Sequence, residues 1–177
     1  MRKKKGFSLI ELLIVVAIIL IIAAIAIPSL LRSRMLANQS AAASTVRTLI
    51  TAESTYFSTY GARQGYANGI ASLGPPAPPL PCPPPPAVPV PTAACLIDAV
   101  LATGVKGGYK YNALAYTVVA PNGPVNFTVS ATPVGPGSTG NNDYCATDDG
   151  VVYFNPPPTG PVGLAGPGPC AGQVLQN

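Results

Sequence analysis

The sequence has no histidine and no tryptophan, and charged residues make up only 9% of it. Without histidine, the chain cannot form a Ser-His or Cys-His catalytic pair or a histidine metal site. Cys82 and Cys95 are too far apart in the sequence for a C-x-x-C motif. These absences exclude the commonest catalytic and metal-binding sites, and we do not expect an enzyme.

The sequence is instead rich in proline, in glycine and in one apolar run. Residues 12–27 are all Leu, Ile, Val or Ala, a composition that is soluble in lipid rather than in water. The 177 residues include 22 Pro and 18 Gly. This length is sufficient for one small domain with appendages.

The net charge of +4 arises from a basic cluster at the start of the chain. Residues 2–5 carry four of the ten basic charges, so removal of residues 1–6 leaves six basic and six acidic residues. A neutral remainder predicts no nucleic-acid partner. The cluster indicates a leader that holds the N-terminus in the cytoplasm by the positive-inside rule, with one membrane crossing and the rest of the chain outside.

One long helix is predicted from Phe7 to about Tyr60. Its first half, residues 7–31, is apolar on every side, so it must be surrounded by lipid or by other helices. Pro28 removes one backbone donor and clashes with the preceding turn. A kink or a local loosening of the helix is therefore expected at Pro28.

The second half of this helix, residues 32–60, is amphipathic. Its apolar residues recur mostly at spacings of three and four, which predicts one stripe packed on a globular domain. The stripe consists of Val46, Leu49, Ile50, Phe57 and Tyr60. Gly61 follows the last of these residues and is a typical helix stop signal.

Residues 61–177 are predicted to form a small head with an antiparallel sheet. Alternating or β-branched apolar residues predict strands at roughly 108–120, 125–132 and 150–155, with a turn at 121–124. A short helix is expected at 94–103, where Gly104 would end it.

The proline-rich segment 74–91 cannot be a helix or a central strand. We expect a stiff surface loop, held at Cys82, rather than a docking site for a proline-binding groove. The tail that begins at Pro156 is also rich in proline and glycine. It is expected to be irregular and to be held by Cys170.

All four cysteines follow the apolar run, and they lie on the far side of any membrane that this run crosses. An even number of cysteines outside the cytosol predicts two disulfides, although free buried thiols are an alternative. Three pairings are open. We favour Cys82–Cys95 and Cys145–Cys170 because each closes a shorter loop.

Acidic residues gather shortly before the last predicted strand. Asp143, Asp148 and Asp149 have Asn141 and Asn142 close by, and oxygen ligands of this kind could hold calcium. The spacing matches no defined calcium loop. We therefore expect solvated turn residues and assign neither a metal nor a cofactor.

Glu11 is the anomaly of the apolar segment, where a carboxylate is costly and needs a partner. One interpretation is that it faces the helix N-terminal dipole, which contributes less than about 1 kcal/mol at exposed sites. The other is that a cut after Gly6 creates the α-amino group of Phe7, within reach of Glu11 across one turn or from a neighbouring copy. Pairing between copies would set their axial register, because any other register leaves a buried charge unpaired.

The stretch Gly-Phe-Ser-Leu-Ile-Glu-Leu from Gly6 closely resembles the processing motif of type IV pilins and of the related pseudopilins of type II secretion, and the match extends to Pro28. The resemblance implies that a prepilin peptidase cleaves after Gly6 and methylates Phe7, and that Glu11 takes the position of the family glutamate. It also implies the α+β fold of these proteins, a long N-terminal helix packed on a small antiparallel β-sheet head. The resemblance covers the first third of the chain strongly, whereas the proline-rich segment departs from it.

The resemblance implies a structural subunit of a type IV pilus-like filament in bacteria. Its precursor would be anchored in the inner membrane among lipid, and the mature chain would form an extracellular or periplasmic homopolymer. Its partners would be further copies, the prepilin peptidase and the inner-membrane assembly machinery.

Two other functions remain open. One is the major pseudopilin of a type II secretion system, a branch that uses acidic loops near the C-terminus for calcium; two disulfides in the head favour a pilin instead. The other is a membrane-anchored binding module that never polymerises.

An ordinary secretory signal peptide is the main rival for the N-terminal segment. Ala24-Ile25-Ala26 could serve as its small-residue cleavage site. Against this interpretation stand Glu11 in the apolar segment and the continuation of the helix beyond Pro28. A mature N-terminus at Phe7 supports assembly, whereas one at Ile27 rules it out.

Overall fold

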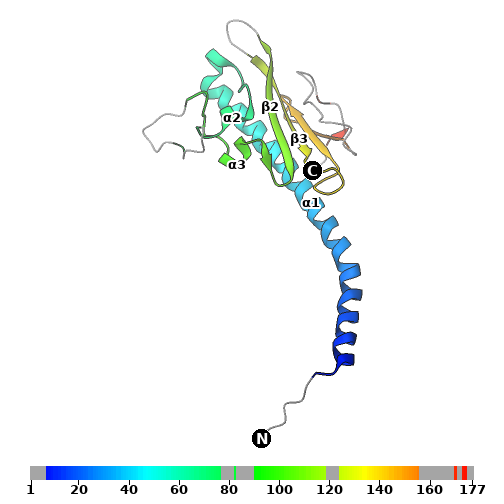
Figure 1. Ribbon diagram of the computed structural model, residues 1–177. Helices are drawn as coiled ribbons and strands as arrows, with labels where there is room; N and C mark the ends of the chain where they lie inside the picture. The colour runs from blue at the N-terminus through cyan, green and yellow to red at the C-terminus, as the bar shows by residue number, and fades with distance from the viewer. Residues whose placement is uncertain are drawn as a thin grey trace.

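The computed structural model describes residues 7–76, 82, 90–118, 124–155, 170 and 173–174. These residues form a long helix α1 (Leu9–Gln64), two short helices and a six-stranded antiparallel sheet. The sheet and the short helices gather along the second half of α1, and the first half projects away from them (Figure 1). The predicted α+β class is confirmed.

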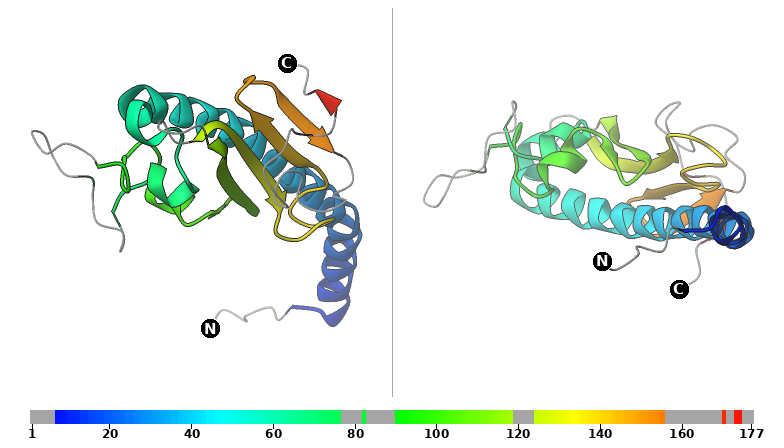
Figure 2. Two further views of the ribbon diagram at one scale, coloured as in Figure 1. Left: turned by 90° about the horizontal axis from the view of Figure 1, so that it is seen from above. Right: turned by 60° about the horizontal axis from the view of Figure 1, so that its bottom comes forward.

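The projecting half of α1 exposes every large apolar side chain from Leu9 to Leu31. Pro28 lies inside the helix. In Figures 1 and 2 the helix bends between its projecting half and the half that carries the head. The head therefore lies beside one end of a rod and leaves the other end uncovered.

The sequence predicted that the helix stops at Gly61, and this prediction was wrong. It continues to Gln64 and ends at Gly65, whose φ of 70° lies in the left-handed region and whose N–H donates to the Gly61 carbonyl at 3.1 Å. Gly61 has a different role, because a Cβ there would lie 2.7 Å from the ring of Phe57. This glycine makes room for an aromatic ring, and Gly65 terminates the helix.

The strands follow one another in the sheet in chain order, each antiparallel to the next. They are β1 (Val105–Lys106), β2 (Tyr109–Val118), β3 (Pro124–Pro133), β4 (Asp143–Thr147), β5 (Val152–Asn155) and β6 (Gln173–Val174). The three predicted strands correspond to β2, β3 and β5. β4 was missed because its five residues lie between two groups of turn-forming Asn, Asp and Gly residues.

The two short helices are α2 (Ile70–Leu73), which the sequence did not predict, and α3 (Ala99–Ala102). α3 is shorter than the predicted helix at 94–103. Asp98 caps it by accepting a hydrogen bond from the backbone N–H of Leu101 at 2.9 Å. The residues before Asp98 are not helical, since Cys95 has a φ of 56°, in the left-handed region, and the N–H of Leu96 donates to the Leu73 carbonyl at 2.7 Å.

The core lies between α1 and one face of the sheet. The sheet contributes alternate residues of its three central strands, and the helix contributes a stripe: Tyr109, Tyr111, Ala113, Phe127, Val129, Ala131, Tyr144 and Ala146 against Ala42, Val46, Leu49, Ala52 and Tyr56. Of the predicted stripe, Val46 and Leu49 are fully buried, and Ile50 and Tyr60 pack at its margin. Phe57 is 39% exposed and stacks on Tyr66 at the edge, so the prediction that it lies inside was wrong.

Candidate functional site

The first turn of α1 holds the residues of the predicted processing site. Ser8 is the N-cap, and Glu11 lies three residues later. The backbone N–H of Ser8 donates to Glu11 Oε2 at 3.0 Å, as in a capping box. In the chain with its leader attached, the Glu11 carboxylate therefore has a local partner at the positive end of the helix dipole.

Phe7 lies outside the helix and is 81% exposed. Gly6 and the rest of the leader lie outside the described residues. An exposed residue in non-helical backbone is accessible to a peptidase, because terminal segments without regular structure are preferred sites of proteolysis. The cleavage at Gly6–Phe7 and the methylation of Phe7 stay predictions.

The apolar half of α1 is long and apolar enough to cross a membrane, and its most apolar window is not buried inside the molecule. Glu11 is the single ionisable residue between Leu9 and Leu31. A continuous exposed apolar surface of this extent is not typical of a soluble monomer. It needs lipid or other apolar helices around it.

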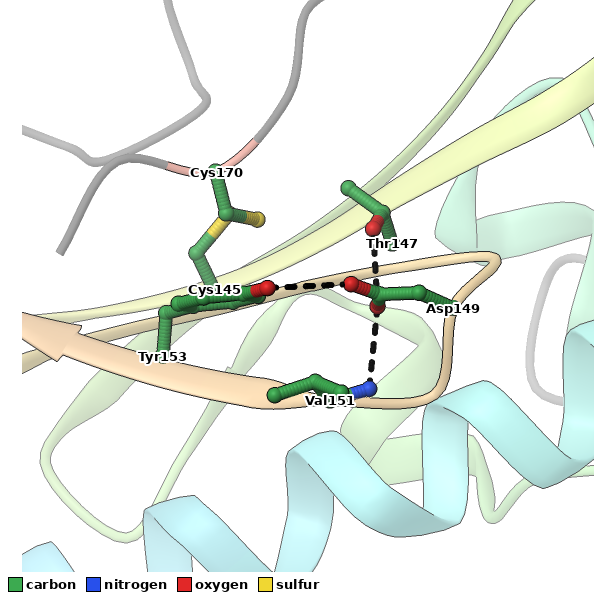
Figure 3. Close-up of a disulfide and its surroundings, with 6 residues drawn as sticks. All are labelled: Cys145, Thr147, Asp149, Val151, Tyr153 and Cys170. Atoms are coloured by element: carbon green, nitrogen blue, oxygen red, sulfur yellow. Dashed lines mark hydrogen bonds between the residues drawn. A yellow bond between two sulfur atoms is a disulfide. The ribbon is translucent and has the colours of Figure 1, made fainter. Parts of the chain in front are cut away.

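Two disulfides join all four cysteines, as Cys82–Cys95 and Cys145–Cys170. This is the pairing that the loop lengths favoured. Cys145 lies on β4 between two core residues, so its side chain points to the sheet face away from α1. Figure 3 shows that the second disulfide attaches Cys170 to this face.

The turn between β4 and β5 is organised by Asp149 (Figure 3). Its Oδ1 accepts hydrogen bonds from Thr147 Oγ1 and from the N–H of Val151, both at 2.9 Å, and its Oδ2 accepts one from the Tyr153 hydroxyl at 3.1 Å. Burial raises the pKa of Asp149, but these hydrogen bonds outweigh it and hold the pKa below its ordinary value. The carboxylate therefore stabilises a tight turn.

The prediction that Asp143 is a solvated turn residue was wrong. It is the first residue of β4, it is fully buried, and within the described residues neither carboxylate oxygen has a hydrogen-bond partner. Burial raises its pKa to about 6. Asp148 and Asp149 follow the opposite end of β4, so the strand separates them from Asp143. In the described ranges, no group of three His, Cys, Asp or Glu residues is placed to hold a metal.

Glu53 is a buried carboxyl that the sequence analysis missed. It lies on the core face of α1 and is fully buried. Its Oε2 accepts a hydrogen bond from the N–H of Ala67 at 3.0 Å, while its Oε1 has no partner among the described residues. Burial raises its pKa to about 8, although the bond from Ala67 acts in the opposite direction. The spacing of Leu49, Glu53 and Tyr56 is the signal that could have placed it on the buried stripe.

Comparison with known proteins agrees with this geometry. The prokaryotic N-terminal methylation motif matches residues 1–27. The chain is 44% identical over 68 residues to the type IV major pilin protein PilA of Myxococcus xanthus, which covers 38% of this chain and 31% of that protein. It is 62% identical over 40 residues to the type IV wide pilus major component PilA4 of Thermus thermophilus, which covers 23% of this chain and 30% of that protein.

These matches span about a third of the length of each relative. No solved structure matches the chain. The motif at residues 1–27 is the one that ends in the exposed apolar half of α1. The chain thus carries the prokaryotic N-terminal methylation motif, and its N-terminal part is similar to major pilin proteins of type IV pili.

Proposed function

We propose that this chain is the structural subunit of a type IV pilus-like filament, cut after Gly6 and assembled through α1. The observation that carries the proposal is the combination of the processing motif with a helix whose first half is apolar, exposed and uncovered by its own head. Exposing apolar surface to water costs roughly 25 cal/mol per Å². A helix that leaves the lipid must therefore be covered at once by the helices of other copies.

The exposed face of the second half of α1 also suits burial between copies. Its hydroxyl groups donate to carbonyls of the same helix three or four residues earlier: those of Thr45, Thr48, Thr51, Ser54, Thr55, Ser58 and Thr59. A hydroxyl that already has an acceptor loses little when water is removed. The only acidic residue between residues 32 and 61 is Glu53, which is buried, so this face offers no carboxylate that packing would have to desolvate.

The relatives support a pilus over the pseudopilus of type II secretion, since both are named as major components of type IV pili. The disulfides support a head in an oxidising compartment, outside the cytosol. With the basic leader in the cytoplasm, the precursor would cross the inner membrane once. It would meet the prepilin peptidase and the assembly machinery there.

N-terminal sequencing and mass spectrometry of the mature protein test the processing step. We expect a chain that starts at Phe7 with a methylated amine, because the motif places the cut directly before this exposed residue. A chain that starts at Ile27 would identify a secretory signal peptide and would contradict assembly through α1.

Electron microscopy of sheared surface filaments tests the subunit role. We expect abundant long fibres in the parent strain, none in a strain without this chain, and fibres again after complementation. Fibres that persist in the deletion strain would show that another protein forms them. Normal export of secreted enzymes in the deletion strain distinguishes a pilus from a secretion pseudopilus.

A further inference from the structure

A groove lies where the projecting half of α1 meets the head. It has a volume of about 260 Å³ and is lined by Leu31, Arg32 and Met35 of α1 and by Gly137 and Ser138 of the loop between β3 and β4. Its walls therefore combine apolar side chains, one guanidinium and one hydroxyl.

The loop that forms one wall is held in place by defined contacts. Asn38 Nδ2 donates to the Thr139 carbonyl at 3.1 Å, which fixes the loop to α1. The Thr139 hydroxyl accepts a hydrogen bond from the N–H of Gly135 at 3.0 Å. Gly137 has a φ of 81°, a conformation that favours glycine, so the loop has a specific local geometry. The groove is thus formed before anything binds in it.

Among the described residues, the groove is lined by a guanidinium and by no carboxylate. Arg32 forms no ion pair with any residue that the structure describes. Of the acidic residues of the head, Glu53 and Asp143 are buried, and Asp98 is paired with Lys106 at 2.7 Å. The remaining two acids lie on the turn at the far end of β4 from this loop. An anion would therefore meet a guanidinium that no carboxylate of the described residues neutralises.

We propose that this groove binds the phosphate of an anionic phospholipid head group. Leu31 ends the exposed apolar run, so Arg32 would lie at the level of the head groups when the run is in a bilayer. Guanidinium groups bind phosphate through two parallel N–H donors. Leu31, one residue nearer the bilayer, would contact the first carbons of the acyl chains. Met35 lies about one turn farther from the bilayer and forms the upper apolar part of the same wall.

Ser138 can supply a second donor to the phosphate. Its hydroxyl donates to the Gly135 carbonyl at 3.1 Å, but that carbonyl also accepts from the backbone N–H groups of Ser138 and Thr139 at 3.0 and 2.8 Å. The hydroxyl can rotate toward a ligand without leaving the carbonyl unsatisfied. This inference rests on the membrane-inserted precursor of the proposed function, and it does not require that filaments form.

The helix offers a matched control for Arg32. Arg34 is exposed and has the same charge, but it lies two residues along α1 and thus about 200° around the helix axis. It does not line the groove. Arg32→Gln and Arg34→Gln remove the same charge at nearly the same depth, and only the first removes it from the groove.

The test uses the full chain in uncharged detergent micelles and counts bound lipid by native mass spectrometry. The probes are phosphatidylglycerol, phosphatidylcholine with the same acyl chains, and inorganic phosphate. We expect the wild-type chain to prefer phosphatidylglycerol to phosphatidylcholine, with a background from the basic residues 2–5 that is the same in every variant. Arg32→Gln should lower this preference about five- to tenfold, the range for one well-placed arginine, and Arg34→Gln should keep most of it.

A second variant tests the opposite wall without changing the helix. Ser138→Asp places a carboxylate in the groove and should lower the preference at least as much as Arg32→Gln. Equal affinity of the wild-type chain for the two lipids would overturn the proposal, as would equal losses in Arg32→Gln and Arg34→Gln. Inorganic phosphate that binds as tightly as phosphatidylglycerol would identify a free-phosphate site instead.

Filament formation is scored separately by electron microscopy. A chain that shows the lipid preference and never forms fibres would refute the proposed function and support this site. A chain that forms fibres and shows no preference would refute the site alone.

Discussion

Glu11→Ala is expected to abolish filament assembly and to leave the precursor folded and inserted in the membrane. After the predicted cut, each copy carries a positive amine at Phe7. In a bundle of apolar helices this amine needs the Glu11 carboxylate of a neighbour. Removing one partner of a buried ion pair costs about 3–5 kcal/mol because the other charge stays buried and unpaired. This penalty recurs at every subunit, so even its lower limit prevents a long polymer.

Glu11→Gln separates this role from the local one that the structure shows. Glutamine is as suitable as glutamate in a capping box, so the hydrogen bond from Ser8 can be kept. It cannot neutralise an amine. If Glu11 serves only to cap the helix, Glu11→Gln will form fibres normally; if it pairs with a neighbour, the variant will fail like Glu11→Ala.

The measurement is the amount of sheared fibre relative to the amount of chain in the membrane fraction. Ser8→Ala is the control, since it removes a capping side chain and leaves the carboxylate. Normal fibres from Glu11→Ala would contradict the proposed assembly contact and would favour the non-polymerising membrane-anchored module.

The parts of the fold that could be predicted from the sequence are those with local causes. Residues 12–27 are apolar whatever surrounds them, and the alternation in 108–120 needs only one buried face to become a strand. The end of α1 was harder to predict. Gly61 and Gly65 are equally plausible stop signals in the sequence, and only the structure shows that Gly61 faces the ring of Phe57 within the helix while Gly65 adopts the left-handed φ that ends it.

The residues of the candidate site also divide into those with local causes and those that depend on distant parts of the chain. Gly6, Phe7 and Glu11 form a contiguous motif, so the sequence was sufficient to predict them. Arg32 could be read as a charge after the apolar run, but its groove depends on a loop about a hundred residues later in the chain. The burial of Asp143 depends on strand pairing that no short window of sequence contains.

Glu53→Gln is expected to remove most of the pH dependence of the stability of the head between pH 6 and pH 8. The pKa of Glu53 is about 8 in the folded chain, against an ordinary value of 4.5. The folded state therefore takes up a proton that the unfolded state releases in this range. The contribution of Glu53 to the free energy of unfolding is therefore fully present below pH 4.5. It decreases as the pH rises, by up to about 1.4 kcal/mol per pH unit, until Glu53 of the folded chain is also ionised near pH 8.

Between pH 6 and pH 8, Glu53 is expected to dominate the pH dependence of the stability of the head. Asp143 has a raised pKa of about 6 and produces a loss of the same sign, but that loss is complete near pH 6. The chain has no histidine, and its cysteines are in disulfides. The α-amino group also titrates there, but it is the same in the wild-type chain and in Glu53→Gln, so it cancels in their difference. The slope above pH 6 therefore reports Glu53, and Asp143→Asn is the matched control that should change only the slope below pH 6.

The free energy of unfolding of the head can be followed by urea titration of tyrosine fluorescence on the full chain in micelles. Glutamine keeps the acceptor for the Ala67 N–H, and the cost of its unpaired amide is the same at every pH. The advantage of Glu53→Gln over the wild-type chain should therefore grow by about 2–3 kcal/mol from pH 6 to pH 8. Parallel curves for the two chains over this range would show that Glu53 is ionised in the folded head, and the account of a neutral carboxyl that holds Ala67 against α1 would be wrong.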